Sequence, residues 1–304
     1  MIIKLYRSAT IGLEISGKKI LFDPWLVDGE YLGAWSHYPY FDLDNNLNEI
    51  NTYDAIYISH IHPDHCSDKT LKRINKDIPV YIHKYHSKFL KFKIERLGFN
   101  VFELQNGKKN EIFKNVNINI FAADNCNPEL CYKLLGCADA GAKDDESQQI
   151  DSLVVIDDGK EVLVNVNDCP YELAQSTIPF ILKQYDKIDI LMSGYGGAGC
   201  YPQCFENLDY SQKIISAKNK EKQFLNQALN FINNLNPKLF LPCAGTYTLT
   251  GKLSKLQNLR GVPSIDEAYA FFDKTLTSAK TIKLNPDSSF DTLLQEYEKK
   301  YITI

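Results

Sequence analysis

Residues 59–65 read Ser-His-Ile-His-Pro-Asp-His and follow directly on the apolar run from Tyr53 to Ile58. That run has the length and composition of a buried strand, so the histidines stand on a loop at a strand end. Three imidazoles and one carboxylate lie within six residues. They can converge on one or two cations, because a tight loop points alternate side chains inward. The segment therefore predicts a metal site, in preference to a chance histidine cluster on a solvated loop.

The rest of the chain is organised in two similar halves. Short apolar runs separated by turn residues predict strands at 2–6, 10–15 and 19–22, and again at 111–113, 116–121, 152–156 and 162–166. Each strand-rich stretch is followed by helices alternating with strands, with helices expected at 68–76, 87–97 and 171–184. A long helix carries Phe224 and Leu235 on its apolar face. This order predicts an α/β protein.

Composition narrows the class of protein. The chain has 304 residues, 44% of them hydrophobic, and we expect one domain over residues 1–304. Its 34 Lys and Arg against 38 Asp and Glu are scattered, so we expect no nucleic-acid partner. The apolar stretches are strand-sized, and we expect no membrane association. Eight cysteines without a zinc-finger CxxC pair and without an export signal predict reduced thiols and a cytoplasmic location.

The histidine segment resembles the HxHxDH motif of the metallo-β-lactamase superfamily. It matches the motif at every defined position with His60, His62, Asp64 and His65. The loop Phe-Asp-Pro-Trp at 22–25 is similar to an Asp-containing loop of that family, and Asp168 stands where the family has a metal-bridging aspartate. The resemblance implies an αββα sandwich of two βα halves with the metal site at the sheet edges.

Four further segments are similar to one branch of this superfamily, which includes the catalytic portion of CMP-N-acetylneuraminate hydroxylases. They are Asp-Pro-Trp-Leu at 23–26, Asn-Asp-Cys at 167–169, Gly-Cys-Tyr-Pro at 199–202 and Pro-Cys-Ala-Gly at 242–245. Those hydroxylases also carry a Rieske iron–sulfur module, which needs a paired Cys-x-His and Cys-x-x-His. The present sequence contains no such pair.

The sequence departs from the family in its later histidines. Dinuclear members supply two more ligands from later strands, whereas all six histidines here precede residue 87. Asp124 occupies roughly the place of the first missing histidine and is either a ligand or a turn-capping aspartate. Cys243 occupies roughly the place of the second, and we expect it to pack as a small hydrophobe. His37 is expected to be a surface loop histidine, with a contact to the site as the alternative.

The remaining ligands predict a metal centre with one tightly bound divalent ion. The first position keeps His60, His62 and Asp168, a set with open coordination positions that suits Fe(II) as well as zinc. The second position keeps Asp64, His65 and Asp168, with one imidazole and two carboxylates, and is expected to hold a transition metal more weakly. We therefore expect one Zn or Fe ion per chain.

The leading functional hypothesis is a metal-dependent hydrolase in which the cation activates a water molecule and polarises the substrate. Asp64, if it is not a ligand, would be the general base, and Asp64 and His65 are the catalytic candidates. The substrate is expected to be small and polar, and carbohydrate- or nucleotide-linked from the resemblance alone. A glycine-rich loop at 194–199 could approach a phosphate, although it lacks a Walker or Rossmann spacing.

Two alternatives stay open. An iron oxygenase is suggested by the ligand set and the hydroxylase resemblance, and it would need electrons from a separate protein or a co-substrate. A metal-stabilised binding protein without activity is suggested by the missing late histidines.

Overall fold

A computed structural model describes residues 1–123 and 151–299, and most strands of this part lie in two large sheets. The strands are β1 (Ile2–Arg7), β2 (Thr10–Ile15), β3 (Lys18–Phe22), β4 (Trp35–His37), β5 (Ala55–Tyr57), β6 (Val80–His83), β7 (Val101–Leu104), β8 (Asn110–Phe113), β9 (Val116–Ala122), β10 (Ser152–Asp157), β11 (Val162–Asn165), β12 (Ile190–Gly194), β13 (Leu239–Cys243), β14 (Tyr247–Leu249), β15 (Lys280–Thr281), β16 (Ser288–Asp291) and β17 (Glu296–Tyr297). The first sheet has the order β17-β16-β1-β2-β3-β5-β6-β7, and the second has the order β15-β13-β12-β11-β10-β9-β8. Strands β14 and β4 form a separate antiparallel pair.

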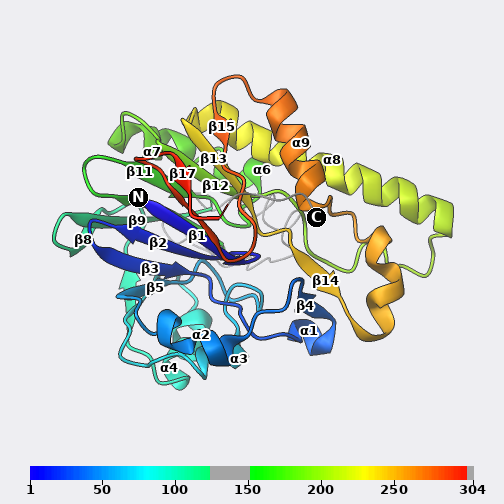
Figure 1. The fold of residues 1–304 in the computed structure, drawn as a ribbon, viewed down its shortest axis with the longest axis horizontal. Helices are drawn as coiled ribbons and strands as arrows, with labels where there is room; N and C mark the ends of the chain where they lie inside the picture. The colour runs from blue at the N-terminus through cyan, green and yellow to red at the C-terminus, as the bar shows by residue number, and fades with distance from the viewer. Residues whose placement is uncertain (124–150, 300–304) are drawn as a thin grey trace.

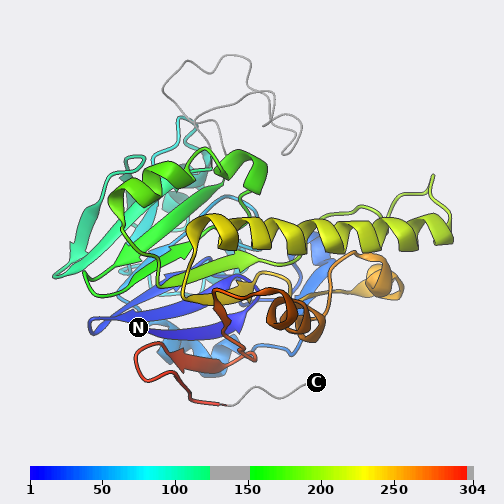
Figure 2. The same ribbon diagram turned by 90° about the horizontal axis from the view of Figure 1, so that it is seen from above.

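Helices cover the outer faces of both sheets (Figure 1). They are α1 (Glu30–Gly33), α2 (Leu43–Ile50), α3 (Asp68–Leu71), α4 (Phe89–Arg96), α6 (Tyr171–Ala174), α7 (Ile178–Gln184), α8 (Tyr210–Leu235) and α9 (Ile265–Thr275), with a 3-10 helix at Gly251–Leu259. Helices α2, α3 and α4 lie on the first sheet, and α7, α8 and α9 lie on the second. Figure 2 shows α8 running along the second sheet and extending past it.

Three apolar layers hold these elements together. The middle layer lies between the sheets and joins Ile11 and Phe22 of the first sheet to Val154 and Met192 of the second. The outer layers pack each sheet against its helices. Strand β10 shows the alternation: Val154 faces the other sheet, whereas Leu153 belongs to the helix-side layer, because successive strand residues point to opposite faces. The layers form the αββα sandwich, so the predicted fold class is confirmed.

Several predicted boundaries are wrong for local reasons. The helix expected at 171–184 is broken into α6 and α7, because Pro179 lacks an N–H group and takes a position in the first turn of α7. Helix α3 ends at Leu71 rather than near 76. No helix is predicted from the sequence at 43–50, yet α2 lies there. Asp42 caps its N-terminus by accepting a hydrogen bond from the Asn45 N–H. The sequence of residues 125–149 is rich in Cys, Asp and Gly and lacks helix or strand periodicity, which predicts an irregular stretch; these residues lie outside the described part of the chain.

Parallel strands of both sheets direct their carboxyl ends to one edge of the sandwich. Strands β3 and β5 are parallel neighbours in the first sheet, as are β11, β12 and β13 in the second. The loops that follow β3, β11 and β13 each contain a residue in the left-handed backbone region, at Asp23, Asn167 and Ala244. This conformation is uncommon outside glycine, and such residues cluster at functional sites. The edge where these loops meet is therefore the expected location of a functional site.

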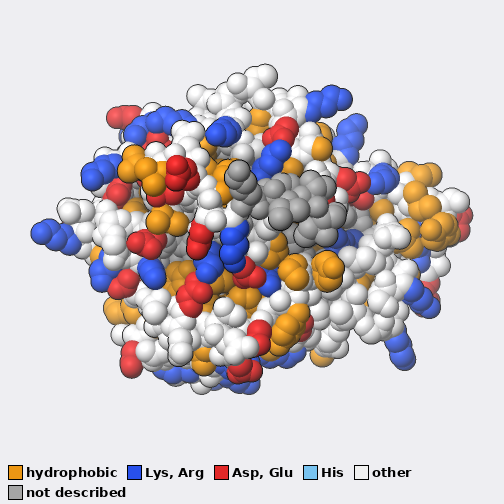
Figure 3. All heavy atoms as spheres, viewed as in Figure 1, with side chains coloured by type: hydrophobic (Ala, Val, Ile, Leu, Met, Phe, Trp, Pro, Cys, Tyr) orange, Lys and Arg blue, Asp and Glu red, His pale blue; other side chains and the backbone are white. Residues whose placement is uncertain are grey.

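The surface shows both charge signs. On the face seen in Figure 3, Lys and Arg side chains are interspersed with Asp and Glu among the coloured residues. In the described part of the chain, none of the helices is both long enough and apolar enough to cross a bilayer.

Candidate metal centre

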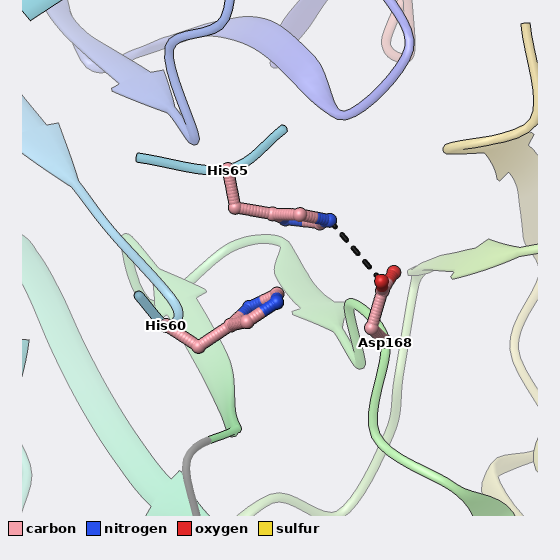
Figure 4. A group of neighbouring side chains, drawn as sticks. All are labelled: His60, His65 and Asp168. Carbon is pink, nitrogen blue, oxygen red and sulfur yellow. Dashed lines mark ion pairs between the residues drawn. The ribbon is translucent and has the colours of Figure 1, made fainter. Parts of the chain in front are cut away.

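Three ligand atoms converge at the edge where the strand ends meet. His60 and His65 come from the loop after β5, and Asp168 comes from the loop after β11. One nitrogen of each histidine and one Asp168 oxygen all lie within 4.8 Å of one another. Figure 4 shows both rings and the carboxylate pointing toward a shared space, with His65 Nε2 at 3.3 Å from Asp168 Oδ2. Two imidazoles and a carboxylate suit Zn²⁺ or Fe²⁺.

The other two motif residues lie beside this group. His62 is exposed, and its Nδ1 lies 3.0 Å from His60 Nε2. Asp64 is buried, with Oδ2 at 3.7 Å from His65 Nε2 and Oδ1 accepting a 2.6 Å hydrogen bond from the Tyr31 hydroxyl. The tightest set thus contains His65, whereas the predicted first position paired His62 with His60. The roles of His62 and Asp64 as ligands stay predictions.

Buried partners fix the orientation of both imidazoles. His65 Nδ1 donates to Asp23 Oδ2 at 2.8 Å, so its Nε2 faces Asp168. His60 Nδ1 contacts Ser59 Oγ at 2.9 Å, and Ser59 Oγ in turn donates to Asp23 Oδ2 at 2.7 Å. Such partners select the tautomer of a metal-binding histidine and orient its second nitrogen. One fully buried carboxylate, Asp23, therefore positions both histidines of the group.

Asp151 is a site residue that sequence reasoning missed. It is buried immediately before β10. Its Oδ1 lies 3.4 Å from His60 Nδ1, and that oxygen has no hydrogen-bond partner. Burial and the nearby charge of Asp168 raise the pKa of Asp151 to about 7. No motif marks this position. The only sequence feature near it is the strand that begins at Ser152 and returns through the hairpin to Asp168.

The charged groups at the centre strongly shift one another's pKa values. Burial lowers the pKa of His60 well below its ordinary value. Burial also disfavours the charged form of His65, but Asp168 and Asp23 outweigh it and raise the pKa of His65 well above the ordinary value. Burial acts to raise the pKa of Asp168, but the charge and hydrogen bond of His65, together with the charges of His60 and His62, outweigh burial and lower it. Perturbed groups of this kind concentrate at functional sites.

Three further candidates have different outcomes. Asp124 lies outside the described residues. Cys243 is buried at the end of β13 within the layer between the sheets, and burial raises the pKa of its thiol to about 12. The surface position expected for His37 is wrong: the ring is buried, its Nδ1 lies 2.7 Å from Asp28 Oδ1, and it packs on Trp25. His37 lies in β4, which pairs with β14, and Tyr247 of β14 lies opposite it. This pairing removes the imidazole from the surface.

A cavity of about 580 Å³ opens above the centre. Its lining includes His62, Asp64 and Asp168 at one end and the glycine-rich loop 194–199 with α8 elsewhere. This volume falls in the range of small-molecule sites. Fold and site together define a metal-binding αββα sandwich with a substrate-sized cavity over its ligands.

The chain belongs to the family described as the beta-lactamase superfamily domain, whose model matches residues 3–244. It is 27% identical over 249 residues to the cytidine monophosphate-N-acetylneuraminic acid hydroxylase of Danio rerio, covering 79% of this chain and 37% of the relative. The corresponding protein of Xenopus laevis is 26% identical over 250 residues, with 79% and 37% covered. The chain therefore spans just over a third of the length of these curated relatives.

Solved structures show the same fold. An isothiocyanate hydrolase from Delia radicum gut bacteria has a TM-score of 0.65 at 14% identity, covering 96% of this chain and 98% of that one. CmlA, a diiron beta-hydroxylase from Streptomyces venezuelae, has a TM-score of 0.55 at 15% identity, covering 92% and 52%. The predicted resemblance to the metallo-β-lactamase superfamily is confirmed.

Proposed function

We propose that this chain is a metal-dependent hydrolase that acts on a small polar substrate and holds about one tightly bound divalent metal, Zn or Fe. The observation that carries the proposal is the convergence of His60, His65 and Asp168 beneath a substrate-sized cavity. A divalent cation held there would lower the pKa of a water molecule and polarise the substrate. The substrate class drawn from the resemblance, carbohydrate- or nucleotide-linked, includes both neutral and anionic molecules.

The protein's own groups have separable roles in this proposal. His60, His65 and Asp168 hold the cation, and Asp23 and Ser59 keep the two rings aimed at it. Asp64 is the proposed general base, because Tyr31 holds one of its oxygens and leaves the carboxylate at the cavity wall. His62, at the mouth of the same cavity, and Asp124 are the proposed additional ligands.

Iron-dependent hydroxylation is the second candidate, and one specific observation favours it. The curated relatives that cover 79% of this chain are named hydroxylases. Two histidines and one carboxylate also form the set typical of oxygen-using Fe(II) enzymes. An oxygenase would need an electron donor, supplied by a separate protein or a co-substrate. A binding protein that uses the metal only for stability is the third candidate.

The deciding experiment is metal analysis of anaerobically purified protein, followed by turnover assays of the zinc and Fe(II) forms with and without oxygen. We expect about one metal per chain and product formation without oxygen. Turnover that requires oxygen and a reductant would replace the hydrolase with the oxygenase. His60→Ala should lose its metal, whereas His86→Ala, at an exposed position on the same sheet edge, should keep it. Full metal retention in His60→Ala would refute the site.

A further inference from the structure

The cavity above the metal centre has an unbalanced charge. Four carboxylate side chains line it, from Asp64, Asp151, Asp168 and Glu172. None of the lining residues among those that the structure describes is Lys or Arg. A divalent cation at the centre would be offset by Asp64 and Asp168, so Glu172, together with the ionised fraction of Asp151, leaves the rest of the cavity acidic. Phosphate-binding sites normally supply Arg, Lys or a row of free backbone amides.

The glycine-rich loop does not compensate for the missing cations. A backbone nest for anions alternates right- and left-handed residues, and within 194–199 only Gly199 has a positive φ, at 133°. Gly196 and Gly197 have a packing reason instead. A Cβ on Gly196 would lie 2.4 Å from Val262, and one on Gly197 would lie 1.8 Å from the Phe224 ring. Gly197 thus lets the loop approach α8 closely and Gly196 lets it approach Val262, so the sequence hypothesis of a phosphate-binding loop finds no support here.

The cavity does offer an acceptor that needs a partner. Gln203 is 2% exposed and lines the cavity. Its Nε2 donates to the Gly199 carbonyl at 2.6 Å, which fixes the side chain, while its Oε1 is buried without any hydrogen-bond partner. An unpaired buried acceptor is unfavourable, so a ligand that displaces the atoms covering this oxygen and donates an N–H or O–H group to it gains a hydrogen bond. Trp35 and Phe224 add aromatic surface to the same wall.

We infer that this cavity selects neutral or positively charged small molecules that bear hydrogen-bond donors, and that it excludes phosphorylated ones. The inference rests on the proposed function, since it assigns the substrate class of the same site. Of the carbohydrate- or nucleotide-linked substrates that the sequence resemblance suggests, the inference excludes the anionic ones. The free nucleoside or polyol form fits the lining, and the nucleotide form does not.

Two native thiols provide a direct probe of this charge. Cys200 and Cys204 are exposed and line the cavity. The metal-loaded protein is treated either with a cationic trimethylammonium methanethiosulfonate or with its anionic sulfonate analogue. Peptide mass spectrometry then gives the labelling rate of each cysteine. A short peptide of residues 198–206 gives the reference ratio of the two rates. The ratio cancels any change in thiol pKa, because both reagents use the same thiolate.

Cys200 interacts with the charge of Lys220, which does not line the cavity, so Cys204 gives the ratio that reports on the cavity. We expect the cation-to-anion rate ratio at Cys204 to exceed the peptide's by roughly fourfold or more, as expected for about one net negative charge nearby. Glu172→Lys should reduce the ratio, whereas Asp186→Lys should not, since Asp186 is an equally exposed carboxylate outside the cavity. CMP should leave the Cys204 labelling rate unchanged. A ratio equal to or below the peptide's, or protection by CMP, would overturn the inference. Neither readout requires turnover, so a failed hydrolase assay is a separate result.

Discussion

Replacing Asp23 by Asn should weaken metal binding although Asp23 is not in the ligand group. The carboxylate is fully buried and accepts three hydrogen bonds, from the Ser59 N–H at 2.7 Å, the Ser59 hydroxyl at 2.7 Å and His65 Nδ1 at 2.8 Å. The same Ser59 hydroxyl contacts His60 Nδ1. Asp23 therefore controls the direction of both rings, and its replacement should release both.

The size of the effect follows from the hydrogen bonds. An Asn side chain has one carbonyl oxygen and one amide group, so at least one of the three donors would face an N–H group. A stranded buried donor costs about 1–3 kcal/mol of stability. Loss of a partner that orients a metal-binding histidine typically lowers metal affinity about 10- to 100-fold. Because two histidines depend on Asp23, we expect a loss near the upper end, about 2.7 kcal/mol of binding free energy.

The assay is competition with a chromogenic chelator, combined with urea denaturation of the metal-free protein. Asp54→Asn is the matched control. Asp54 accepts bonds from the Lys19 N–H at 2.9 Å and Lys18 Nζ at 2.7 Å, at the opposite end of the same strand, β3. It should lower stability without changing metal affinity. If the metal affinity of Asp23→Asn is within twofold of that of the unsubstituted protein, other contacts hold both rings and the proposed role of Asp23 is wrong.

Three further predictions concern pH, sulfur and stoichiometry. Burial lowers the pKa of His83 to about 4, so as the pH falls from 6.5 toward 4 the unfolded chain protonates this histidine before the folded chain does. The stability that is present above pH 6.5 is therefore lost over this range. Urea denaturation between pH 7 and pH 5 should show a loss about 2 kcal/mol greater in the unsubstituted protein than in His83→Phe; equal losses would contradict this. Cobalt-substituted protein should lack a thiolate charge-transfer band, and a band that vanishes in Cys243→Ser would make Cys243 a ligand. Dialysed protein should retain about one metal per chain, and a value near two that falls in Asp124→Ala would refute the mononuclear prediction.

Local patterns were sufficient for the architecture. The alternation of β10 and the apolar run before His60 are properties of neighbouring residues, and the structure places both as strands. The motif from His60 to His65 is equally local, because one loop supplies all its side chains. The break between α6 and α7 was missed because a helical periodicity can continue across a point where Pro179 forces a new helix to begin.

The contacts that orient the site could not be predicted in the same way. His65 and Asp23 are 42 residues apart, and His60 and Asp151 belong to different sheets. No spacing rule connects such residues. Asp23 and His65 meet because β3 and β5 are parallel neighbours in the first sheet, and His60 and Asp151 meet because the two sheets stack. His37 was missed for a related reason, since its burial depends on the pairing of β4 with β14 from a distant part of the chain and on the contacts with Asp28 and Trp25. The histidines of the motif are thus marked locally in this chain, whereas their grouping with Asp168, their orientation and the charge of the cavity depend on the packing of distant segments.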